Sequence, residues 1–95
     1  MVEMQAVTAA EIAALRDQLR AAQDGAEAPY RRALAWVARR AEAHALASGA
    51  PAEATSCAAL LLVHALRHTY DPARNPVIWV DALIARAARR PVPKP

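Results

Sequence analysis

Residues 52–68, which read AEATSCAALLLVHALRH, decide the fold of this chain. The stretch is apolar on nearly every side of a helix, a pattern typical of a helix enclosed by others. We therefore expect a helix over about 52–68 to be the central and most buried element. Its longest uncharged part, residues 54–66, is too short to span a bilayer, and no membrane insertion is expected.

Three more helices are predicted outside this stretch. The first spans about 8–23, where Thr8 and Glu11 have the spacing of a capping box. The second spans about 26–47 and ends at a Ser-Gly-Ala-Pro turn. The fourth spans about 76–89, after an Asn-Pro start signal. The apolar stripe expected to face the core in the second helix comprises Tyr30, Leu34, Val37 and Ala41.

The composition fits one small all-α domain. The chain has 95 residues, of which 27 are Ala and 2 are Gly, and it has no Phe. These features predict a single bundle of four helices over residues 1–95, ordered from about 8 to 90, with a disordered Pro-rich tail at 91–95. Because the larger apolar residues are few, the core is thin. A partner or a homodimer is therefore expected to contribute to its stability.

The positive charge is concentrated in the C-terminal half. Residues 1–53 carry six Arg and seven acids, a net charge of −1, whereas residues 54–95 carry five Arg, one Lys and two acids, a net charge of +4. A basic C-terminal half is compatible with nucleic acid or an acidic protein surface, but charge alone favours cations that simply suit the end of a helix dipole. The candidate phosphate-binding residues are Arg86, Arg89 and Arg90.

The residues that carry catalytic chemistry are few. His64 and His68 stand four apart on a helix, but no Glu follows His64 in the metalloprotease pattern and no third ligand is evident. Cys57 lies in an apolar helix and is expected to be a small buried hydrophobe. The sequence therefore predicts neither an enzyme, a metal site nor a cofactor. Residues 1–5 lack the pattern of a signal peptide, which predicts a cytoplasmic location.

The most specific motif is the end of the third helix with its following loop, LLLVHALRHTYDPAR at residues 60–74. It resembles region two of the extracytoplasmic-function sigma factors of bacterial RNA polymerase, where V-H-x-x-x-H-T-Y-D-P-A-R-P is followed by P-W-L. Trp79 falls where the family has its Trp. Upstream, LRAAQDGAEAPYRR at residues 19–32 resembles the opening of the same region. The resemblance covers about residues 12–90 and implies an all-helical fold.

The resemblance also implies partners. Region two of these sigma factors binds the polymerase core and melts and reads the promoter −10 element, and anti-sigma factors grip the same domain. The loop and fourth helix retain the family pattern, and the expected partner-binding residues are His68, Tyr70, Asp71, Arg74 and Trp79.

Two segments depart from the family. The third helix begins PAEATSCA (residues 51–58) where the family has an acidic D-A-E-D-L-V-Q-E. The fourth helix, ALIARAARR at residues 82–90, lacks the family's Asp and meets Pro91. The loss of polymerase-facing and promoter-facing side chains favours a decoy that binds an anti-sigma factor and so frees the true sigma factor. The alternatives are a minimal sigma factor that binds polymerase and promoter DNA, and a helical homodimer.

Overall fold

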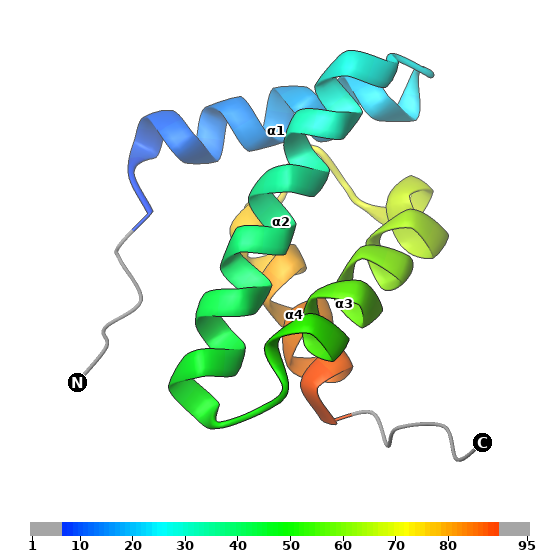
Figure 1. The fold of residues 1–95 in the computed structure, drawn as a ribbon. Coiled ribbons are helices and arrows are strands. Elements are labelled where there is room, and N and C mark those ends of the chain that lie inside the picture. The colour runs from blue at the N-terminus through cyan, green and yellow to red at the C-terminus, as the bar shows by residue number, and fades with distance from the viewer. Residues whose placement is uncertain (1–6, 90–95) are drawn as a thin grey trace.

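The structure, a computed structural model, describes residues 7–89, which form four α-helices joined by short turns (Figure 1). No strand occurs in this part of the chain, so the predicted all-α fold is confirmed. The predicted Arg90 and Pro-rich tail at 91–95 lie outside the described residues. The helices are α1 (Ala9–Gln23), α2 (Glu27–Ser48), α3 (Ala52–Leu66) and α4 (Pro76–Arg89), with a 3-10 turn, η1, at Arg67–Thr69.

Local signals in the sequence set the helix ends. The capping box forms as predicted: the Glu11 amide donates to Thr8 Oγ1 at 3.1 Å, and the Glu11 carboxylate accepts from the Thr8 amide at 3.5 Å. α2 ends at Gly49, whose φ of +76° is left-handed and strained for any residue with a Cβ. Pro51 immediately precedes α3, and Pro76 is the first residue of α4. A proline is tolerated at this first position because a backbone N–H there would have no acceptor within the helix.

The helices stack in two layers. α2 packs against α1 and α3, and α3 packs against α4. The smallest extent of the molecule is 21 Å, close to two helix diameters. Figure 1 shows α1 crossing one end of α2, with α4 behind α2 and α3. Each helix therefore has one side turned to the core and another turned outward.

The core combines a few branched side chains with many alanines. Leu15, Val37, Val63, Val80 and Ile84 are at most 1% exposed and come from all four helices. Small side chains let α2 approach its neighbours closely, so that little apolar volume is needed to exclude water. The fully buried alanines are Ala33, Ala41, Ala45 and Ala59.

The predicted core stripe of α2 is wrong at its N-terminal end. There the fully buried residue is Ala33, one position before the predicted Leu34. Val37 and Ala41 are buried as expected, and Leu34 is partly buried but packs against the core, whereas Tyr30 is only partly buried. The N-terminal part of the predicted stripe consists of the large residues Tyr30 and Leu34. The close approach of α1 and α3 selects the smallest ones instead, because a large side chain there would hold the helices apart.

The prediction for the third helix is also wrong in part. α3 ends at Leu66 rather than His68, because the chain tightens into η1. One side of α3 faces solvent: Leu61 is 68% exposed and Cys57 is exposed, not buried. α3 is covered by α2 on one side and α4 on another, and none of the described helices covers the third. Apolarity on all sides therefore did not mean burial on all sides.

Candidate protein-docking surface

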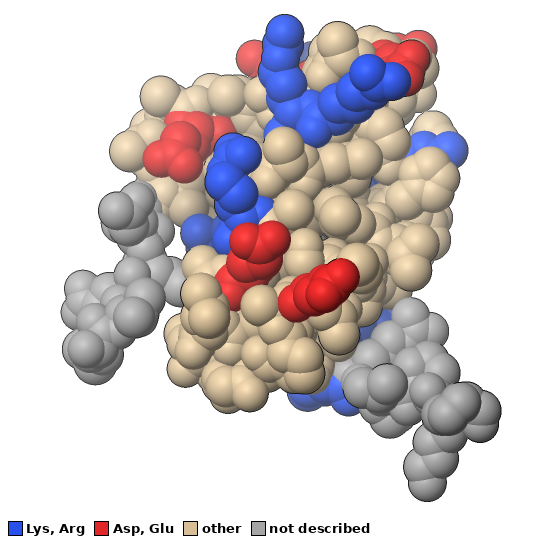
Figure 2. All heavy atoms as spheres, viewed as in Figure 1, with Lys and Arg blue, Asp and Glu red and all other residues tan. Residues whose placement is uncertain are grey.

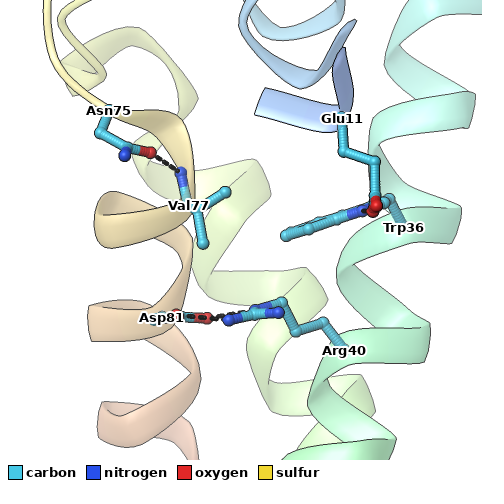
Figure 3. Close-up of polar contacts among 6 residues, drawn as sticks. All are labelled: Glu11, Trp36, Arg40, Asn75, Val77 and Asp81. Carbon is cyan, nitrogen blue, oxygen red and sulfur yellow. Dashed lines mark hydrogen bonds and ion pairs between the residues drawn. The ribbon is translucent and has the colours of Figure 1, made fainter. Parts of the chain in front are cut away.

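The loop between η1 and α4 is held rigidly by its own polar groups. The Ala73 amide donates to Asp71 Oδ1 at 2.9 Å, and the Arg74 amide donates to the Asp71 carbonyl at 2.9 Å. Asn75 caps α4, because its Oδ1 accepts from the Val77 amide at 2.9 Å (Figure 3). These turn contacts present the start of α4 in a fixed position.

A second brace comes from α1. The Gln23 side-chain amide donates to the carbonyl oxygens of Arg67 at 2.9 Å and of Tyr70 at 2.8 Å. Both carbonyls belong to the segment where α3 has ended and no helical partner is available for them. Gln23 therefore fixes the chain on entry to the loop, and the sequence analysis did not identify this role.

Tyr70 is the internal support of the loop. Its side chain is 3% exposed, its ring lies 5.3 Å from that of Trp79 between centroids, and its hydroxyl donates to the Arg74 carbonyl at 2.9 Å. Burial raises the pKa of Tyr70, and the nearby Arg16 charge offsets this only in part. In the folded chain the buried Tyr70 ring positions Trp79 and Arg74, and its contact with a partner stays a prediction.

The exposed part of this region forms one continuous surface, which we call the α4 face. It consists of Arg74, Asn75, Ile78, Trp79 and Ala82, and these residues line a shallow, mainly apolar hollow of about 430 Å³. Ile78 is 69% exposed, and the neighbouring Trp79 is partly buried. A large exposed aliphatic side chain beside a Trp and an Arg is typical of the centre of a protein interface.

Ile78 was not among the predicted site residues. The buried stripe of α4 runs through Val77, Val80 and Ile84. Ile78 and Ala82 lie on the opposite side of the same helix, and both are exposed. A helical projection of residues 76–89 would have separated these two stripes from sequence alone.

The predicted partner-binding residues do not all lie together. Asp71 forms an exposed ion pair at 3.9 Å with Arg74, which belongs to the α4 face. His68 belongs to a different hollow, which it lines with Tyr30 and His64. In that hollow the Tyr30 hydroxyl and His64 Nδ1 share a hydrogen bond at 2.7 Å, and burial raises the pKa of Tyr30. His68 therefore lines a different hollow from Arg74 and Trp79.

The two described basic candidates lie at the other end of α4. Arg86 and Arg89 are both exposed in its last turns. Arg86 follows Ala82 by four residues, so the outer side of α4 changes from apolar at its start to cationic at its end. Arg89 also lines a separate hollow with His44 and Ser48.

An ion pair fixes the orientation of α4 against α2. Arg40 Nε donates to Asp81 Oδ1 at 2.6 Å, and a second guanidinium nitrogen donates to Oδ2 at 2.8 Å (Figure 3). These hydrogen bonds raise the pKa of Arg40 in spite of its burial. The same guanidinium lies over the ring of Trp36, 5.4 Å from its centroid. No sequence pattern indicated the pairing of Arg40 with Asp81, because the two residues are far apart in the chain.

Neither a metal site nor a membrane span is found in residues 7–89. No group of three or more His, Cys, Asp or Glu residues is placed to hold a metal ion. None of the described helices is both long and apolar enough to cross a bilayer.

Compared with models of protein families, with curated proteins and with solved structures, the chain has no significant match. The resemblance to sigma factors therefore stays a prediction.

Proposed function

We propose that this chain is a non-enzymatic regulator of transcription that binds an anti-sigma factor through its α4 face, as a decoy for the true sigma factor. The observation that carries the proposal is the exposed Ile78 beside Trp79 and Arg74. A monomer gains nothing in folding by leaving such a side chain in water, whereas a partner that covers it gains apolar burial. The choice of partner comes from the resemblance of residues 60–74 to region two.

The rigid loop supports the same proposal. Gln23, Tyr70, Asp71 and Asn75 all hold the backbone that presents the α4 face. A surface that is already ordered loses little conformational entropy when a partner binds. The cations Arg86 and Arg89, further along the exposed side of α4, suit a partner that adds acidic side chains to an apolar centre.

The test is capture of partners from the native host on the tagged chain, followed by mass spectrometry. The wild-type chain is expected to recover an anti-sigma factor without polymerase subunits. Ile78→Asp places a charge in the apolar centre and should abolish this recovery. Leu46→Asp is the matched control, because Leu46 is 72% exposed, lies on α2 and is not part of the α4 face. Helical circular dichroism checks that both variants fold.

Two other results would overturn the proposal. Recovery of polymerase core subunits would favour the minimal sigma factor. Recovery of nothing but the chain itself would favour the homodimer. Equal losses in Ile78→Asp and Leu46→Asp would show that the α4 face has no special part in the capture.

Binding of polymerase and promoter DNA is the second candidate, and the exposed Arg86 and Arg89 favour it. Phosphate contacts of this kind weaken steeply as salt concentration rises. Titration of a promoter duplex at two salt concentrations tests it. Tight binding with a steep salt dependence that Arg86→Gln reduces would support it, and weak binding at low salt would exclude it.

A further inference from the structure

A second surface, which shares no residue with the α4 face, lies where α1 crosses α2. We call it the basic groove, and it is lined by Glu11, Ala14, Leu15 and Gln18 from α1 and by Arg32, Ala35, Trp36 and Arg39 from α2. The groove has a volume of about 340 Å³. Figure 2 shows long cationic side chains projecting over the end of the molecule where α1 and α2 meet.

The two cations of the groove are not used by the fold. Arg32 and Arg39 are exposed, and neither forms an ion pair with another described residue. By contrast, Arg31 pairs with Glu27 one turn before it, and Arg40 pairs with Asp81. Around α2, the unpaired Arg32 and Arg39 thus lie between the paired Arg31 and Arg40, and the unpaired ones border the groove.

The spacing within the groove is regular. Arg32, Trp36 and Arg39 follow one another at intervals of four and three residues, which places them on one side of α2. The seven residues from Arg32 to Arg39 correspond to about two helical turns, a rise of about 10 Å. The Trp36 ring therefore lies between the cations Arg32 and Arg39. The distance along α2 between these two cations matches that between two acidic residues seven positions apart on another helix.

The Trp36 ring is held before any partner arrives. Its Nε1 donates to Glu11 Oε2 at 3.5 Å, and Arg40 lies over the ring (Figure 3). With Arg40 on the ring, a nucleic-acid base has less freedom to stack there. An edge of Trp36 beside Ala14 and Ala35 suits an aliphatic side chain.

We infer that the basic groove binds an acidic amphipathic helix of a partner protein. Carboxylates seven residues apart on that helix pair with Arg32 and Arg39, and an aliphatic side chain between them packs on Trp36. Binding here leaves the α4 face free, so one partner or two can engage the chain. The inference does not depend on the proposed anti-sigma role.

The experiment uses the full ¹⁵N-labelled chain and a synthetic helical peptide that carries Glu seven residues apart with Leu between them. The indole N–H of Trp36 is the reporter, because it points at Glu11 inside the groove. The acidic peptide is expected to shift this resonance in a saturable manner. Arg32→Glu/Arg39→Glu should weaken binding by about tenfold or more, because two attractive contacts become repulsive.

A control with the same change in net charge is Arg20→Glu/Arg31→Glu, because both side chains are exposed and neither lines the groove. This variant should keep the Trp36 shift and most of the affinity. If both double variants weakened peptide binding equally, net charge alone would explain the loss of affinity, and the inference would be overturned. Absence of a Trp36 shift would overturn it as well, and so would tighter binding of a single-stranded oligonucleotide than of the peptide.

Discussion

At the scale of single residues, Tyr70 shows how a motif residue can be conspicuous in sequence and yet hidden in the fold. It belongs to the His-Thr-Tyr-Asp-Pro run that carries the resemblance, but its ring is 3% exposed and supports Trp79. Asp71 likewise accepts hydrogen bonds that close the turn, while part of its side chain remains exposed. A motif of this kind therefore reports the shape of a loop as much as a contact with a partner.

The burial of Tyr70 predicts a loss of stability at alkaline pH. Its folded-state pKa is raised above the usual value of about 10, so the unfolded state ionises first as pH rises. The stability that depends on the neutral hydroxyl is fully present below about pH 10 and is lost as pH increases through the folded-state pKa. Urea unfolding between neutral pH and pH 11 should show this decline.

The variant Tyr70→Phe separates Tyr70 from Tyr30, whose pKa is also raised by burial. It should lower the free energy of unfolding at neutral pH by about 1 kcal/mol, because the Arg74 carbonyl loses its donor. It should also make the alkaline decline shallower. An unchanged alkaline slope would show that Tyr70 does not contribute to it.

At the scale of elements, α4 is positioned by contacts of two kinds. Its buried stripe packs on α3, while the pair of Arg40 and Asp81 fixes its rotation relative to α2. The pair has two hydrogen bonds and leaves only 16% of the Arg40 side chain exposed, against 42% for Asp81. Its partial burial distinguishes it from an ordinary surface ion pair.

Asp81→Asn is expected to lower the free energy of unfolding by about 1–2 kcal/mol, because a charged acceptor is removed from a partly buried guanidinium. The matched change Glu27→Gln disrupts a pair whose side chains are 75% and 74% exposed, and should have an effect of at most about 0.5 kcal/mol. Chemical denaturation measures both. A double-mutant cycle with Arg40→Met isolates the pairwise term, and a coupling near zero would contradict the proposed role of the pair.

At the scale of the whole molecule, a thin core and exposed apolar side chains coexist. Val37 is fully buried at the centre of α2, whereas Leu61 is 68% exposed on α3. The fold does not use all of its apolar side chains, and those left outside are available for contacts between molecules. With few large residues in the core, each buried branched side chain carries a large share of the stability.

Val37→Ala should therefore lower the free energy of unfolding by about 2 kcal/mol, from the methyl groups removed and the cavity that they leave. Leu61→Ala should change it by at most about 0.5 kcal/mol, because the side chain is in water in the folded chain. Thermal and urea unfolding of the two variants give the comparison. A large loss in Leu61→Ala that depends on protein concentration would instead indicate that α3 is covered in a dimer.

The sequence by itself determined the helices and their ends. Thr8, Gly49 and Pro76 act on their immediate neighbours, and capping and backbone conformation are local effects that need no tertiary information. The all-α class followed from the same signals. The helix bounds that moved did so at the end of α3, where the chain tightens into η1.

Only the tertiary structure decided which faces were covered. It buried Tyr70, exposed Cys57, placed His68 and Trp79 in different hollows and joined Arg40 to Asp81. The physical reason is that burial depends on which helices pack together and how closely. Small alanine side chains set those distances, and hydrophobicity along the chain does not encode them. The α4 face and the basic groove are therefore features of the packed molecule, although each of their residues was visible in the sequence.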